Sequence, residues 1–172
     1  MPNPLPFTMQ QQKQTNWCSA ALAASVADLM GNSNQWTQCK LANEQLSQSG
    51  CCDDGSGPDC NQIAFLETSL SIIRHRRPGG GNPAHRAASP DEVRQEINSN
   101  RPIGVRVAWP ESGDQGHFIL ISGYDDSTAV FQVVVNDPEN PDGTPGKNYS
   151  YQDLTERGYL GRGVWTDSYF TQ

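Results

Sequence analysis

The chain has 172 residues, the size of about one domain, and its 19 acidic and 12 basic side chains give a formal net charge of −7. This negative charge argues against non-specific binding to nucleic acid or to an anionic membrane surface. No apolar run approaches the roughly 18 residues of a transmembrane helix. A chain of this size buries roughly 70% of its unfolded surface, so we expect a single domain with a hydrophobic core.

The N-terminal residues lack both the basic segment and the apolar stretch of an export signal. We therefore expect that the protein is not exported by that route, or that a leader or larger precursor lies outside the printed sequence. Residues 1–14 are rich in proline and glutamine and are expected to form an extended arm.

The first predicted helix contains Cys18 in its first turn. Thr15 or Asn16 is the expected N-cap, and the alanine-rich segment that follows has larger apolar residues at helical spacing, at Leu22, Val26, Leu29 and Met30. The unpaired N–H groups and the dipole of a helix N-terminus favour negative charge, so a thiol there is readily present as the reactive thiolate. The alternative is a small buried residue with no chemical role.

The cysteine count is odd, and four of the five cysteines lie within one short segment, at Cys39, Cys51, Cys52 and Cys60. A bond between neighbouring cysteines is strained, which leaves two sets of disulfides: 39–51 with 52–60, or 39–52 with 51–60. A zinc site and four free thiols are the alternatives. Disulfides would imply an oxidising destination.

Two more helices are predicted in the first half, near residues 38–48 and 62–73, the second with an apolar face formed by Ile63, Leu66 and Leu70. Residues 74–90, rich in Gly, Pro and basic side chains, are expected to form a mobile surface loop. An exosite for an acidic substrate and a self-cleavage site at Gly79–Gly81 are alternatives, and His75 and His85 are expected to be solvated. Ser89 then caps a short helix over 91–99.

Strands are predicted at about 103–109, 117–124, 129–136 and 162–170. A helical half (about 15–88) that faces a twisted antiparallel β half (89–172) is an α+β fold with its site in the cleft between the halves. Trp109 and the turn at 110–115 are expected to form a rim of that cleft, although Trp109 could also be a core residue.

A hairpin centred near residue 127 would bring His117 and Asp137 to the same end of two neighbouring strands. A carboxylate bound to one imidazole nitrogen fixes the tautomer and supports the imidazolium. A slip of one residue would place Asn136 there instead, and Asp137 could simply begin a turn. An acyl-transfer site also needs oxyanion donors, for which the Cys18 N–H and a side-chain amide from residues 10–14 are candidates.

Three motifs occur in a recognisable order: Gln12 six residues before the cysteine of Asn16-Trp17-Cys18-Ser19-Ala20-Ala21, then Gly116-His117-Phe118, then Asn136-Asp137-Pro138. Together they resemble papain-like cysteine peptidases, in particular the compact bacterial branch of secreted effectors and bacteriocin-processing peptidases. The likeness spans residues 8–170. Ser19 departs from the family pattern, which usually has Trp there, and this difference concerns local packing more than chemistry.

The resemblance implies a role for each matched residue. Cys18 would be the nucleophile, His117 the base and later the acid, and Asp137 the group that orients His117. Gln12 would complete the oxyanion hole with the Cys18 amide. The family needs neither a metal ion nor an organic cofactor.

The sequence thus predicts a cysteine endopeptidase that acts on protein or peptide substrates. We expect a monomer, secreted or delivered from the producing cell, with no nucleic-acid or membrane partner; an inhibitor or immunity protein is a partner that the resemblance allows. The alternatives are a papain-fold deamidase or acyltransferase toxin and a catalytically inactive binding module.

Overall fold

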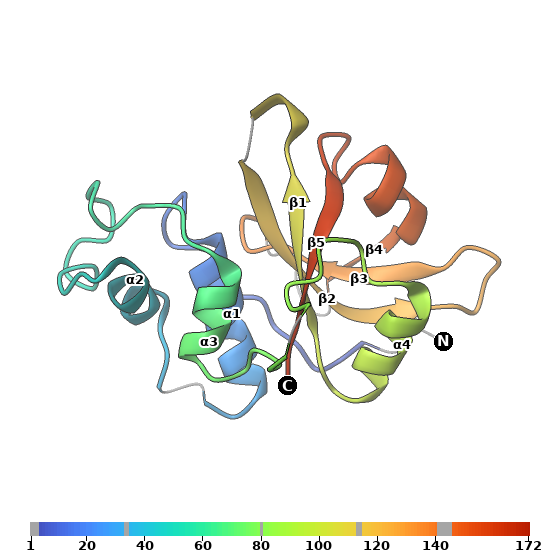
Figure 1. Ribbon diagram of the computed structural model, residues 1–172, viewed down its shortest axis with the longest axis horizontal. Helices are drawn as coiled ribbons and strands as arrows, with labels where there is room; N and C mark the ends of the chain where they lie inside the picture. The colour runs from blue at the N-terminus through green and yellow to red at the C-terminus, as the bar shows by residue number, and fades with distance from the viewer. Residues whose placement is uncertain (1–3, 33–34, 80, 113–114, 141–145) are drawn as a thin grey trace.

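The computed structural model describes residues 4–32, 35–79, 81–112, 115–140 and 146–172. These residues form four α-helices and a five-stranded antiparallel sheet with the spatial order β4-β3-β2-β1-β5. The elements are α1 (Cys18–Leu29), α2 (Gln38–Leu46), α3 (Leu66–Ile72), α4 (Pro90–Asn98), β1 (Ile103–Ala108), β2 (Gly116–Asp125), β3 (Gln132–Asn136), β4 (Lys147–Ser150) and β5 (Val164–Phe170). In Figure 1, α1, α2 and α3 lie together on one side, and the sheet lies on the other with α4. The predicted α+β class is confirmed.

Helix α1 is the central element of the helical side, since every residue from Ser19 to Ala27 is buried and the helix contacts α2, α3 and β2. Its alanines allow these neighbours to approach closely. Contrary to the prediction, its N-cap is Trp17. Thr15 and Asn16 do not cap the helix because both bind Asn61: the Asn61 side chain donates to the Thr15 hydroxyl, and the Asn16 side chain donates to the Asn61 carbonyl.

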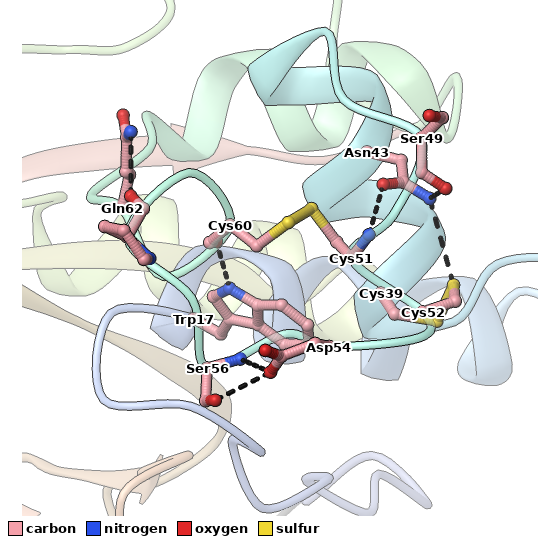
Figure 2. Close-up of a disulfide and its surroundings, with 11 residues drawn as sticks. Trp17, Cys39, Asn43, Ser49, Cys51, Cys52, Asp54, Ser56, Cys60 and Gln62 are labelled. Carbon is pink, nitrogen blue, oxygen red and sulfur yellow. Dashed lines mark hydrogen bonds between the residues drawn. A yellow bond between two sulfur atoms is a disulfide. The ribbon is translucent and has the colours of Figure 1, made fainter.

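The four clustered cysteines form the disulfides Cys39–Cys52 and Cys51–Cys60, which is one of the two predicted sets. The loop closed by Cys51–Cys60 covers the ring of Trp17, whose indole N–H donates to the Cys60 carbonyl at 2.8 Å (Figure 2). Gly55 of this loop packs so closely that a Cβ atom would lie 2.6 Å from that ring. The disulfide loop therefore holds the residues that directly precede the α1 cysteine.

Helix α3 is shorter than predicted, because the chain remains extended until Phe65. Leu66 and Leu70 are fully buried as expected, but Ile63, predicted for the same face, is 64% exposed. Asn61, bound to residues 15 and 16, holds the preceding chain outside the helix.

The capping of α4 is confirmed: the Ser89 hydroxyl accepts from the Glu92 N–H, and the Glu92 carboxylate accepts from the Ser89 N–H. In the sheet, β3 begins at Gln132 rather than 129, and β4 was not predicted. Strand β4 has four residues, Lys-Asn-Tyr-Ser, with no buried position, so it lacks the apolar alternation that identifies a strand.

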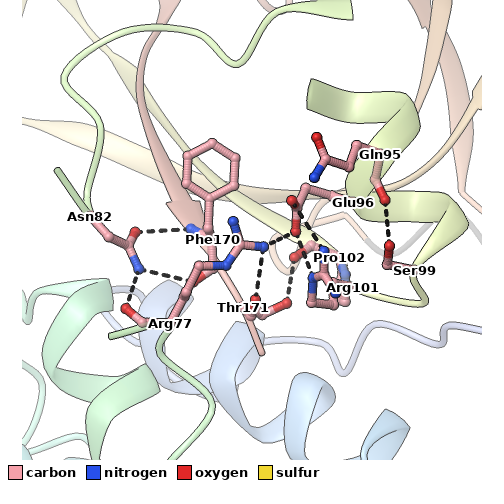
Figure 3. A network of polar contacts seen from close by, with 9 residues as sticks. All are labelled: Arg77, Asn82, Gln95, Glu96, Ser99, Arg101, Pro102, Phe170 and Thr171. Carbon is pink, nitrogen blue, oxygen red and sulfur yellow. Dashed lines mark hydrogen bonds and ion pairs between the residues drawn. The ribbon is translucent and has the colours of Figure 1, made fainter. Parts of the chain in front are cut away.

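The segment 74–90 was expected to be a mobile loop, yet its described part is tied to the end of β5. Arg76 pairs with Thr171 and Ala84 with Ser168 as isolated β-bridges. The Asn82 side chain donates to the Phe170 carbonyl and accepts from the Phe170 N–H, both at 3.0 Å (Figure 3). Gly80, the central residue of the self-cleavage site considered at Gly79–Gly81, lies outside the described residues.

Three basic side chains of this segment, Arg77, His85 and Arg86, already have acidic partners, which weakens the argument for an exosite. Arg77 binds Glu96, and Arg86 binds Glu92 through two hydrogen bonds of 2.7 Å. His85, although 83% exposed, binds Asp167 at 2.7 Å. Glu96 also binds Arg101, so two arginines share one carboxylate (Figure 3).

Glu96 is buried, with its side chain 4% exposed, and it joins α4 to the segment that follows α3. Glu96→Ala is expected to lower the free energy of unfolding by about 2–3 kcal/mol, because it leaves two arginines, each about a third exposed, without their carboxylate. Urea denaturation measures this loss. The control Asp91→Ala, which breaks an exposed pair with Arg94, should leave the midpoint nearly unchanged; equal losses in both variants would contradict the argument.

In the part of the chain that the structure describes, no helix is long and apolar enough to cross a membrane. Nor do the described residues contain a group of three or more His, Cys, Asp or Glu side chains placed to hold a metal ion.

Candidate active site

Cys18 is the first residue of α1 and the free cysteine of the chain, and it is only partly buried. The first N–H groups of a helix have no partner within the helix, so they face the same region as the thiol. The predicted placement of Cys18 in the first helical turn is therefore confirmed.

His117 lies near the start of β2 and is buried, with 7% exposure. Its Nε2 atom is 2.6 Å from Oδ1 of Asp137. The Cys18 side chain lies close enough to the imidazole to raise the pKa of His117. Since Nε2 faces Asp137, Nδ1 is the nitrogen that remains for the thiol. The structure thus brings together Cys18 from the helical side and the His117–Asp137 pair from the sheet.

The pairing of β2 with β3 explains why Asp137, and not Asn136, contacts the histidine. The hairpin differs from the predicted register: Asn136 pairs with Leu120, and a bulge at Ser122 shifts the strands. If this register is continued, Asp137 lies two positions along the chain from the residue directly opposite His117. A shift of two keeps both side chains on one face and within diagonal reach. The Asn136 side chain instead donates to the Ser122 hydroxyl at 2.7 Å.

The electrostatics of the pair favour two charged groups. Burial acts to lower the pKa of His117, but the hydrogen bonds to Asp137 and Cys18 and the attraction to both side chains outweigh it and raise this pKa to about 10. Burial acts to raise the pKa of Asp137, but the hydrogen bond and charge of His117, with donors from Tyr159 and Glu139, lower it below its usual value. An imidazolium and a carboxylate therefore coexist near neutral pH.

Asp137 accepts hydrogen bonds at both carboxylate oxygens. Oδ1 accepts from His117 and from the Glu139 N–H at 2.8 Å, and Oδ2 accepts from the hydroxyl of Tyr159 at 2.7 Å. Asp137 and Tyr159 are both buried. The sequence did not single out Tyr159, because an isolated tyrosine after a glycine carries no local pattern that points to a site.

Trp109 lies against the imidazole, with ring centroids 6.3 Å apart and planes within 9° of parallel. The guanidinium of Arg162 lies 4.7 Å from the centroid of the indole. Trp109 thus contacts the site residue His117 and is only partly buried, as expected for a rim residue. Of the predicted turn at 110–115, Gly113 and Asp114 lie outside the described residues.

Gln12 lies close to Asp137, since its backbone N–H donates to the carbonyl of the next residue, Pro138, at 2.8 Å. Its side-chain amide donates to the carbonyls of Gln14 and Thr15, at 3.1 and 2.9 Å. Both amide hydrogens are thus directed to the loop that leads to Cys18. The side-chain oxygen is buried without a partner among the described residues. To donate to an oxyanion, the Gln12 amide would have to give up its hydrogen bond to one of these two carbonyls.

A cavity of about 530 Å³ lies between the two sides of the molecule, beside His117. One wall is the chain around the start of α3 and the other is formed by β1, β2 and β5. The lining residues are Ile63, Ala64, Phe65, Glu67, Arg106, Gln115, Gly116, Phe118, Asp167 and Tyr169. Its size is typical of pockets that bind small ligands or side chains.

Comparisons with known proteins agree with this architecture. A mite-allergen structure, from work on antibody cross reactivity between Blo t 1 and Der p 1, has 13% identity and a TM-score of 0.57, and the match covers 96% of this chain and 67% of the other. Digestive procathepsin L 3 of Tenebrio molitor larval midgut has 10% identity and the same TM-score, with coverages of 98% and 67%. At these identities the likeness concerns the fold. A search of the curated proteins gave no match.

The sequence also matches the family described as "Peptidase_C39 like family" over residues 4–167, which is nearly the whole chain. This match and the two structural neighbours confirm the predicted resemblance. The chain belongs to the Peptidase_C39 like family of cysteine peptidases, and its fold is papain-like.

Proposed function

We propose that the protein is a cysteine endopeptidase that hydrolyses peptide bonds in protein substrates, with Cys18 as nucleophile, His117 as base and acid, and Asp137 as the orienting group. The observation that carries this proposal is the convergence of the free thiol, at a helix N-terminus, with a buried His117–Asp137 pair. This is the arrangement that nucleophilic catalysis requires: a nucleophile, a base within reach, and a third group that orients the base.

In the proposed reaction, the Cys18 thiolate attacks the peptide carbonyl carbon and forms a C–S bond, and the carbonyl oxygen becomes an oxyanion. The Cys18 N–H and one Gln12 amide hydrogen donate to that oxyanion. The C–N bond then breaks, and the proton of the His117 imidazolium passes to the leaving amine. A water molecule, deprotonated by the now neutral His117, attacks the thioester and releases the acid and the thiolate.

The 530 Å³ cavity is the proposed binding site for one side chain of the substrate. Gly116 and Phe118 of its lining flank His117, so a peptide that reaches the thiol passes the cavity mouth. Apolar side chains, among them Ile63, Phe65 and Tyr169, form much of its wall. The proposed preference is for an apolar substrate residue near the cleaved bond.

The two disulfides support an oxidising destination, and we place the protein outside the producing cell, secreted or delivered. A deamidase or acyltransferase is the alternative, because the same three residues serve those reactions when the acyl acceptor or the amide differs.

The test compares two samples of the protein on a whole-cell lysate, one untreated and one alkylated with iodoacetamide under non-reducing conditions. Since Cys18 is the free thiol, alkylation modifies it alone. We expect new N-termini, identified by mass spectrometry, only with the untreated protein and with an apolar residue recurring near the cut. New N-termini from the alkylated protein would refute the proposal, and deamidated side chains without new N-termini would favour the alternative.

A further inference from the structure

Tyr159 belongs to a short turn that lies next to Asp137 of the site. The turn follows the single helical turn Asp153–Arg157 and begins at Gly158, whose φ of +99° lies in the region that favours glycine. The Tyr159 N–H donates to the Gly163 carbonyl, and the Arg162 N–H donates to the Tyr159 carbonyl. The backbone of Tyr159 is thus fixed on both sides.

The ring of Tyr159 is also fixed. It is 3% exposed and packs against Tyr149 of β4, with centroids 5.2 Å apart. Its hydroxyl is therefore held at one place, 2.7 Å from Oδ2 of Asp137. The opposite oxygen of the same carboxylate receives the His117 ring.

We propose that Tyr159 is a positioning residue of the peptidase site: its hydroxyl orients the Asp137 carboxylate and holds it as an anion, and through Asp137 it aligns His117 with Cys18. The proposal rests on the function proposed above. Burial and the charge of Asp137 raise the pKa of Tyr159, so the phenol stays protonated and acts as a donor. Its hydrogen bond in turn helps to lower the pKa of Asp137.

The titratable groups around the pair come from several elements. Cys18 of α1 faces His117, and Lys147 and Tyr149 of β4 line a cavity of about 140 Å³ together with Asp137 and Tyr159. The test below removes only the Tyr159 hydroxyl, so the other titratable groups are the same in the variant and in the wild type.

The test compares Tyr159→Phe with the wild type and with the control Tyr151→Phe, which also loses one hydroxyl, but one bound to the Ala88 carbonyl. In Tyr159→Phe the pKa of Asp137 rises, because its anion loses a donor, so Asp137 takes up a proton at higher pH. We expect the acid limb of kcat/KM to move upward by about one to two pH units, and kcat at neutral pH to fall about tenfold with KM nearly unchanged.

The rate at which iodoacetamide alkylates Cys18, measured against pH, gives a second readout that needs no peptide substrate. Its acid limb is expected to move in the same direction in Tyr159→Phe and to stay in place in Tyr151→Phe. If the wild type cleaves no protein, the proposed function fails, and this alkylation profile still decides the role of Tyr159.

Two results would overturn the proposal. One is an unchanged kcat and unchanged acid limbs in Tyr159→Phe, which would show that only the ring matters. The other is an equal loss of rate at every pH with both limbs in place, which is the effect of a smaller folded fraction and so of a purely structural role.

Discussion

Replacing Cys18 with alanine is expected to abolish peptide cleavage, with kcat reduced at least about 10³-fold, while the fold remains intact. The other four cysteines are held in disulfides, so no second thiol can take over the attack. Alanine removes only the sulfur and is the best helix former, so the start of α1 should tolerate it. Cleavage of a protein substrate, followed by mass spectrometry of new N-termini, measures the loss.

Two further measurements on Cys18→Ala check that the thiol is absent and that the fold is intact. The wild type is expected to take up one equivalent of iodoacetamide without reduction, and Cys18→Ala none. Circular dichroism and thermal unfolding should match the wild type. Cleavage that persists in a preparation of Cys18→Ala that takes up no reagent would show that another residue is the nucleophile.

Replacing His117 with alanine is expected to lower kcat by about 10²–10⁴-fold. The imidazole has two proposed tasks: as imidazolium it supports the thiolate and protonates the leaving amine, and as neutral base it activates water. Alanine removes both, and it leaves Asp137 buried without its main partner. Both tasks are measured by steady-state kinetics on a peptide identified from the lysate experiment. The alkylation rate of Cys18 at mildly acidic pH reports separately on the support of the thiolate.

The matched control is His75→Ala. His75 contacts Asn32 and the C-terminal carbonyl of Gln172, away from the proposed site, so its loss should leave kcat within about twofold. A similar fall in both variants would point to a general loss of stability. Activity of His117→Ala close to that of the wild type would exclude this histidine as the base.

The sequence could predict those site residues whose positions follow from local rules. Cys18 begins a helix with clear apolar spacing, so its place in the first turn follows from periodicity. Asp137 was placed beside His117 although the predicted register was wrong, because the error was an even number of residues and the alternation of a strand preserves the face. Next to the turn the predicted register is wrong by three residues, and the bulge at Ser122 reduces this offset to two. The bulge leaves no mark in the residue types.

The features that the sequence could not predict depend on contacts between distant segments. Tyr159 reaches Asp137 because the turn at 158–163 brings its ring against Tyr149 of β4, and no periodic pattern marks a turn of this kind. The choice between two disulfide sets likewise required the tertiary position of Cys60, next to Trp17. The basic segment at 74–86 appeared to be free because its acidic partners, such as Glu96 and Asp167, lie far along the chain.

The division of the site between helix and sheet has a consequence for the newly made chain. Cys18 leaves the ribosome 99 residues before His117, and Asp137 follows 20 residues later. The proposed nucleophile is on α1, whereas the His117–Asp137 pair needs the completed β2–β3 hairpin. A nascent or truncated chain that ends before β3 therefore carries the thiol without the His117–Asp137 pair. The proposed hydrolysis is expected to begin only after the C-terminal half has been synthesised and has folded onto the first.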